Sequence, residues 1–220
     1  MTSIETESTM ADRAQTFIDW TRINAKALTV GAAIVVVAAA GYWFYARSKQ
    51  IEATNAERAL LQAKQSMSAG NLALAQSDLQ KVYSRWESTA AGVEAAMLLA
   101  QLDYDGGKYQ DGITRLQKVA GSSAASANES TIRSLEGDGY AQMGKFAEAG
   151  KAYEGAAGAT SYENEKAFQT SKAARAYQTG GDTAKARAIW TALLNDPKAQ
   201  SMASEARVRL GELLVRPAKP

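Results

Sequence analysis

The sequence predicts an all-α protein in which a single N-terminal transmembrane helix precedes an α-solenoid. Two observations carry this prediction. An uncharged, apolar segment covers residues 27–46. Four glycines then recur at a spacing of 37 residues: Gly70, Gly107, Gly144 and Gly181. A period of this length, sustained over four copies, is typical of repeated units that stack on their neighbours. We therefore expect about four helix–turn–helix repeats and a C-terminal capping helix.

The composition is that of a folded helical protein and offers little for catalysis. Hydrophobic residues make up 46% of the chain and charged residues 22%, with three prolines. The chain has neither Cys nor His, which removes thiol nucleophiles, imidazole acid–base groups and the usual zinc ligands. The formal net charge is only +2 and basic residues are scattered. We therefore expect no enzyme, cofactor, bound metal or nucleic-acid partner.

Residues 1–26 are expected to form an N-terminal tail that ends in a short amphipathic segment. Residues 1–12 are polar and typical of a disordered tail. Within the stretch that follows, Phe17, Trp20 and Ile23 recur at a spacing of three. This spacing predicts a short helix at the membrane interface, leading into the apolar segment.

The apolar segment, residues 27–46, matches the length of a membrane span. Its twenty uncharged residues would extend about 30 Å as a helix, the thickness of a bilayer's hydrocarbon core. Four aromatic residues at positions 42–45 lie where an interfacial belt is expected. A cleaved signal peptide is the alternative, but the long, mixed-charge stretch before the apolar run and the length of the run favour an uncleaved anchor. Basic residues flank both sides, so charge does not decide the orientation.

Residues 47–220 are expected to form the helical repeat domain, whose third unit has the order and spacing of a tetratricopeptide repeat. The residues in that pattern are Gly137, Tyr140, Gly144, Phe146, Ala149, Tyr153 and Ala156. The turn glycine is expected to end the first helix with φ > 0. The other units are weaker copies, with Ser66 and Asp103 in place of the first-helix aromatic residue and Thr183 in place of the second-helix one.

The pattern predicts nine helices after the span. Their expected bounds are 47–69, 71–86, 89–105, 108–120, 127–143, 145–158, 161–179, 182–195 and 198–215. The Ser- and Ala-rich stretch 121–130 is expected to be a loop. The last helix should be a cap with a solvated outer face that carries Arg207, Arg209 and Glu212. Three carboxylate pairs are expected on solvated helix faces: Asp103 with Asp105, Glu136 with Asp138, and Glu163 with Glu165.

Solenoids of this kind bind partners along an inner groove lined by first-helix residues that packing does not use. Counted in phase from the turn glycines, the candidate binding residues are Met67, Met97, Gln101, Tyr104, Asp138, Phe168, Arg175 and Gln178. Their mixture of Met, aromatic and polar groups would suit varied clients, because Met repacks easily. The alternative is that several of them are buried between helices or exposed without a binding role.

The N-terminal third resembles the start of the bacterial ancillary Sec-translocon subunits of the YfgM type. The residues that carry the resemblance are Phe17, Asn24, Lys26, Leu28, Gly31, Gly41, Trp43 and Arg47, and it extends through residues 59–102. The resemblance implies a cytoplasmic N-terminus, a single pass through the bacterial inner membrane and a tetratricopeptide-like periplasmic domain. It also implies association with the SecYEG channel, and with periplasmic chaperones or newly exported client proteins.

A structural or assembly subunit of another inner-membrane complex is the alternative function, in which the repeat domain docks one fixed partner. Nothing in the sequence indicates an oligomeric state.

Overall fold

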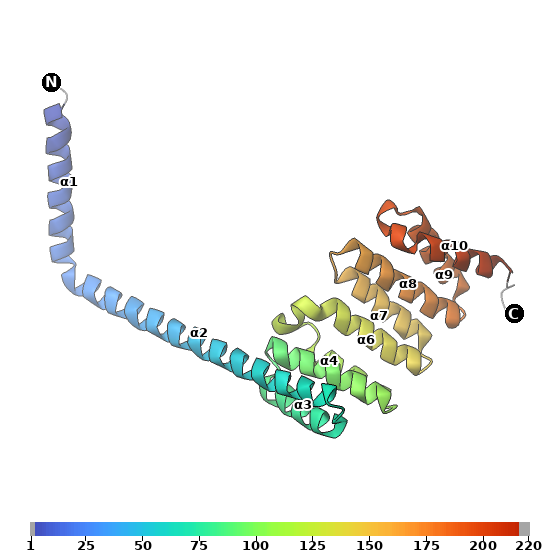
Figure 1. Cartoon of the computed structure of the whole chain (residues 1–220). Coiled ribbons are helices and arrows are strands. Elements are labelled where there is room, and N and C mark those ends of the chain that lie inside the picture. The colour runs from blue at the N-terminus through green and yellow to red at the C-terminus, as the bar shows by residue number, and fades with distance from the viewer. Residues whose placement is uncertain (1–2, 216–220) are drawn as a thin grey trace. The chain divides into compact units, whose positions relative to one another are not determined.

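The structure is a computed structural model that describes residues 3–215 of the chain. Over this range the secondary structure is entirely helical, as the sequence predicts (Figure 1). The chain divides into two compact units, Met1–Glu52 and Ala53–Pro220, and each is described by itself.

Ten α-helices and two short 3₁₀ helices make up the described residues. They are α1 (Ser3–Ile23), α2 (Ala25–Ser68), α3 (Leu72–Trp86), α4 (Ala90–Asp105), α5 (Tyr109–Val119), η1 (Ser123–Asn128), α6 (Glu129–Gln142), α7 (Phe146–Gly158), α8 (Glu163–Thr179), α9 (Thr183–Asn195), η2 (Pro197–Ala199) and α10 (Gln200–Val215). The 3₁₀ helix η1 occupies most of the stretch expected to be a loop. From α3 onwards the α-helices agree with the predicted bounds to within two residues.

The first unit departs from the sequence prediction at its N-terminal end. Helix α1 begins at Ser3, so the prediction of a disordered tail over residues 1–12 is wrong for the residues that the structure describes. The segment contains no glycine or proline that would interrupt a helix. The helix breaks at Asn24, whose side-chain Nδ2 and backbone N both donate to the Trp20 carbonyl, at 2.9 Å and 3.0 Å. Asn side chains compete with the helical ladder in this way.

Helix α2 contains the apolar segment and is long and apolar enough to cross a membrane. An 18-residue window within it has a mean hydropathy of 1.9, and none of that window is buried within the protein. Side chains around the helix, such as Ile34, Val37 and Phe44, are more than 60% exposed. A helix that is apolar on all sides and unburied by its own chain has the character of a membrane span.

The separate helix expected over residues 47–69 does not exist, because α2 continues without a break to Ser68. No glycine or proline occurs between Gly41 and Gly70 to end it. Its last turns belong to the second unit, where Ala56, Leu60 and Ala63 are buried. These turns therefore serve as the first helix of the first repeat.

The four periodic glycines form four equivalent turns. Gly70, Gly107, Gly144 and Gly181 have φ values of 77°, 73°, 73° and 88°, as predicted. In each turn the residue after the glycine donates its backbone N–H to a carbonyl five residues earlier, as from Lys145 to Tyr140 at 2.9 Å. This is the Schellman arrangement, and the φ that it needs at the glycine is disfavoured for residues with a Cβ.

Each turn joins the two helices of one unit, and the units stack in chain order. From α3 to α10 each α-helix of the second unit contacts the next one along the chain (Figure 1). First helices of neighbouring units also contact each other directly, α4 with α6 and α8 with α10. Buried residues of α2 to α6 form one hydrophobic cluster and those of α7 to α10 another. This stacking places the first helices on one shared face.

Glycines inside the helices allow close packing of tyrosine rings. A Cβ on Gly137 of α6 would lie 2.5 Å from the Tyr153 ring of α7. A Cβ on Gly150 of α7 would overlap the Tyr177 ring of α8. The rings therefore occupy the space that a side chain would need.

The expectation that Asp103 lies on a solvated helix face is wrong. It is only 5% exposed, and its Oδ2 accepts hydrogen bonds from Arg115 Nε at 3.2 Å and Nη2 at 3.1 Å. Arg115 also donates from Nη1 to Gln80 Oε1 at 3.1 Å. Asp103, which replaces the aromatic residue in the second unit, therefore links α4 to α5. Arg115 links both helices to α3 through its hydrogen bond to Gln80.

Candidate protein-binding face

Side chains link the first helices of successive units across their shared face. Lys64 of α2 pairs with Glu94 of α4. The Tyr104 hydroxyl of α4 donates to the Leu135 carbonyl of α6 at 3.0 Å. Further on, polar side chains link α6 to α8 and α8 to α10. We call this surface the first-helix face. It consists of residues 53–68, α4, α6, α8 and α10.

Lys172 of α8 is held by three groups on its neighbours. Its Nζ lies 2.8 Å from Asp138 Oδ1 and 2.9 Å from Ser134 Oγ, both on α6. The same Nζ lies 4.5 Å from the centre of the Tyr153 ring, a cation–π contact. Tyr153 in turn donates its hydroxyl to Asp138 Oδ1 at 2.7 Å. Burial, with the hydrogen bond to Asp138, raises the pKa of Tyr153 well above its ordinary value, so this phenol stays a neutral donor.

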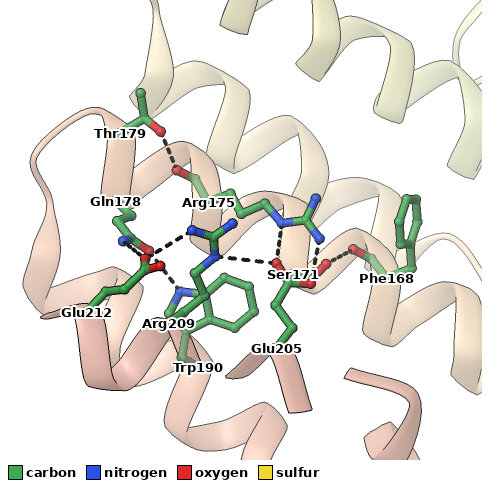
Figure 2. A network of polar contacts seen from close by, with 9 residues as sticks. All are labelled: Phe168, Ser171, Arg175, Gln178, Thr179, Trp190, Glu205, Arg209 and Glu212. Atoms are coloured by element: carbon green, nitrogen blue, oxygen red, sulfur yellow. Dashed lines mark hydrogen bonds and ion pairs between the residues drawn. The ribbon is translucent and has the colours of Figure 1, made fainter. Parts of the chain in front are cut away.

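A bidentate ion pair joins α8 to α10. Arg175 donates from Nε to Glu205 Oε1 at 2.7 Å and from Nη2 to Glu205 Oε2 at 2.6 Å (Figure 2). Arg209 lies next to Glu205 and donates from Nη1 to Glu212 Oε2 at 3.0 Å. The hydrogen bond with Arg175 lowers the pKa of Glu205 below its ordinary value of 4.5. Glu205 is therefore ionised at neutral pH, and the network alternates two cations with two carboxylates.

Gln178 connects this network to the core. Its Nε2 lies 3.5 Å from Glu212 Oε2, and its Oε1 accepts a hydrogen bond from Nε1 of the fully buried Trp190 at 3.3 Å (Figure 2). The Trp190 contact fixes which end of the Gln178 amide faces the carboxylate.

Two hollows open on this part of the face. The larger, of about 630 Å³, is lined by Arg175, Gln178, Thr179, Arg209 and Glu212. A smaller one of about 210 Å³ is lined mainly by residues of α6, α7 and α8: Ala141, Phe146, Tyr153, Lys172, Arg175, Ala176 and Thr179. Arg175 and Thr179 line both hollows. Charged and hydroxyl groups therefore line both hollows on this part of the first-helix face.

The structure brings together only some of the predicted binding residues. Arg175 and Gln178 line the larger hollow, and Asp138 lies in the neighbouring link to α8. Gln101 is exposed, and Phe168 is 45% exposed. Their role in binding stays a prediction.

The other three predicted residues contribute mainly to packing. Met97 is 9% exposed and belongs to the hydrophobic core, and half-buried Met67 packs against the same cluster. The half-buried Tyr104 uses its hydroxyl to bond the α6 backbone. These three residues offer little of the adaptable apolar surface that their side chains suggest in the sequence.

Sequence reasoning missed the acidic and basic residues that α10 contributes. Arg209 and Glu212 were expected on the outer face of the cap, but both line the larger hollow. The signal was present, because Glu205 lies 37 residues after Phe168 and Glu212 lies 37 residues after Arg175. Extending the period into the last helix would have found Glu205 and Glu212, but not Arg209, which lies 37 residues after Lys172. Lys172 has no such signal, since its in-phase predecessor is the buried Leu135.

Among residues 3–215, no group of three or more acidic side chains is placed to hold a metal ion.

Comparison with known proteins agrees with the repeat architecture. A family model described as a tetratricopeptide repeat-like domain matches residues 19–133 and again residues 55–172. The chain belongs to the tetratricopeptide repeat-like family. The second match of this family begins 36 residues after the first, close to the 37-residue glycine spacing, so the two alignments differ by one unit.

A solved structure shares the tetratricopeptide repeat-like fold. It is the crystal structure of nearly identical TPR-like repeats of a putative kinesin light chain from Podosopora anserina. It is 15% identical in sequence, with a TM-score of 0.53 over 74% of this chain and 92% of the other. At this identity the likeness concerns the fold alone. No match was found among curated proteins.

Tetratricopeptide repeat-like domains are typically scaffolds for protein–protein interaction. The first-helix face has the chemistry for that role, with fixed ion pairs beside open hollows.

Proposed function

We propose that this protein is a membrane-anchored scaffold that acts beside the Sec translocon and receives newly exported proteins. In this proposal α2 crosses the bacterial inner membrane once, the N-terminus lies in the cytoplasm and the repeat domain lies in the periplasm. Partner chains bind along the first-helix face.

The observation that carries the proposal is the combination of one unburied apolar helix with a tetratricopeptide repeat-like domain. The apolar window of α2 supports membrane anchoring, because burial of its exposed apolar side chains in a bilayer removes them from water. The repeat domain supplies the interaction surface. We propose the translocon as the partner because the N-terminal third resembles the ancillary Sec-translocon subunits. This resemblance extends from Phe17 into the first repeats.

Docking of one fixed partner in another membrane complex is the second candidate, and the polar character of the face favours it. Met97 is buried and Tyr104 is bonded to the α6 backbone, so little adaptable apolar surface is available to unfolded clients. The Arg175–Glu205 pair is instead held in one geometry. Fixed charges of this kind select a complementary surface.

Photocrosslinking in intact bacterial cells separates the two candidates. A photoreactive residue replaces exposed Gln101 on the first-helix face, and a second variant carries it at exposed Glu148 on α7 as the control. The translocon proposal predicts crosslinks from position 101 to the channel and to many exported chains, and few from position 148. One stoichiometric partner from position 101, with neither channel nor clients, contradicts the proposal and supports the fixed-partner alternative.

A further inference from the structure

Helix α10 has the phase of a first helix, but no second helix covers it within the described residues. Five residues form its outward surface, which we call the α10 face: Ser204, Arg207, Val208, Gly211 and Leu214. All five are exposed, and Val208 and Leu214 are 61% and 74% exposed. Four of the five equivalent residues are buried in the unit before it, and the fifth, Thr170, is half-buried.

The comparison with α8 shows how much apolar surface is involved. Ala167, Ser171, Ala174 and Tyr177 lie 37 residues before Ser204, Val208, Gly211 and Leu214. They are between 0% and 3% exposed, and α8 packs against α9, the second helix of its unit. The Tyr177 ring also lies against Gly150 of α7, so the helices before and after α8 both contribute to the burial of this surface.

The α10 face repeats the surface of α6 most closely. Ser130, Arg133 and Gly137 of α6 lie 74 residues, or two periods, before Ser204, Arg207 and Gly211, and all three residue types are the same. On α6, Gly137 and Arg133 receive α7, whereas Ser130 donates a hydrogen bond to Glu165 of α8 at 2.7 Å. The Tyr153 ring of α7 lies on Gly137, and Gly155 of α7 lies against the Arg133 side chain. A Cβ on Gly211 would meet nothing within 4 Å.

We infer that the α10 face is a docking surface for an amphipathic helix of a partner protein, of the same chemistry as α7. The docked helix presents an aromatic ring to Gly211, with small residues on either side and a glycine or alanine opposite Arg207. Its stripe follows the spacing of Ala149, Tyr153 and Ala156, and it lies on α10 as α7 lies on α6. Exposed Leu214 packs against it, and its removal from water favours the complex. This inference does not depend on the translocon proposal.

A peptide titration with the full chain in detergent or nanodiscs tests the inference. The probe is a fluorescent peptide with the sequence of residues 145–158, stapled between the exposed positions 147 and 151 to hold it helical. The inference predicts saturable binding. Replacing the tyrosine of the peptide by alanine should weaken binding about tenfold.

Two protein variants locate the binding site. Gly211→Leu fills the space intended for the aromatic ring, and Leu214→Glu places a charge on the α10 face. Both positions are exposed in the free chain, so the fold should be retained. Each should weaken peptide binding about tenfold or more. Gly158→Leu is the matched control, because its Cβ would also meet nothing within 4 Å but lies at the end of α7.

Three results would overturn the inference. The peptide fails to bind the wild-type chain, or it binds Gly211→Leu and Leu214→Glu as tightly as wild type, as it would by displacing α7 from its own unit. In the third, analytical ultracentrifugation shows that the wild-type chain dimerises and Leu214→Glu makes it monomeric, in which case a second copy occupies the α10 face.

Discussion

At the scale of single residues, the turn glycines and one buried ion pair are the features from which we predict changes in the stability of the repeat domain. The glycines adopt φ near +75° in four equivalent turns, a conformation that costs other residues about 1–2 kcal/mol. Asp103 and Arg115 place charges where an apolar core would otherwise extend. Each feature leads to a prediction for the free energy of unfolding.

Replacing Gly144 by Ala should destabilise the repeat domain by about 1 kcal/mol, because the turn needs a positive φ. Urea unfolding of the full chain, followed by circular dichroism, measures the change. Gly158→Ala is the control, since Gly158 does not have a positive φ and a Cβ there meets open space. The prediction is wrong if the two variants unfold at the same urea concentration.

Replacing Arg115 by Met should lower the free energy of unfolding by about 3 kcal/mol, because it leaves the Asp103 carboxylate buried without its partner. The double variant Asp103→Leu with Arg115→Met should recover most of that loss, since no charge then remains buried. The same urea titration gives both values. If the double variant is as unstable as Arg115→Met alone, the interaction of Arg115 with Gln80 matters more than the pair.

At the scale of elements, helix α10 is tied to α8 through Glu205. Arg175 holds this carboxylate from two nitrogens, and the two helices contact each other directly. The tie forms only while Glu205 is ionised, which makes the stability of this end of the solenoid depend on pH.

Replacing Glu205 by Gln should lower stability at pH 7 by about 0.5–1 kcal/mol. The folded-state pKa of Glu205 lies below 4.5, so its contribution is present above that value and is lost as the pH falls through the folded pKa. The thermal unfolding midpoints of the wild-type protein and Glu205→Gln should differ at pH 7 and become equal below about pH 4. Exposed Glu148→Gln serves as the control. A difference that stays constant down to pH 3 would show that charge is not the cause.

The sequence predicts the elements of the repeat domain well because their ends carry local signals. Glycine ends each first helix with a defined φ, as Gly144 does, and capping residues such as Asp182 begin helices. Elsewhere such signals are missing, and the predictions are poorer. The early start of α1 and the continuation of α2 to Ser68 both lie where no glycine or proline marks a boundary.

The binding face is harder to predict because it depends on partners distant in sequence. Periodicity places Arg175 on the right face, but the residue that holds it, Glu205, lies thirty positions later. Periodicity likewise places Met97 on the first helix without showing that it is buried. Which in-phase residues stay available depends on packing between units, which a one-dimensional pattern does not contain.

At the scale of the whole molecule, the chain combines an apolar helix that it does not bury with a tetratricopeptide repeat-like domain. The two compact units differ in their apolar side chains, since those of the apolar segment of α2 are exposed and the second unit contains both buried hydrophobic clusters. The central claim is that the membrane separates the N-terminal tail from the interaction domain.

The accessibility of single cysteines tests this claim most directly, because the chain has no cysteine of its own. Ser201→Cys on α10 and Gln15→Cys on α1 are both exposed positions on opposite sides of the apolar segment. In intact spheroplasts, a membrane-impermeant maleimide should label position 201 at once, and position 15 only after detergent is added. Labelling of both positions before detergent, or of neither, would contradict the account.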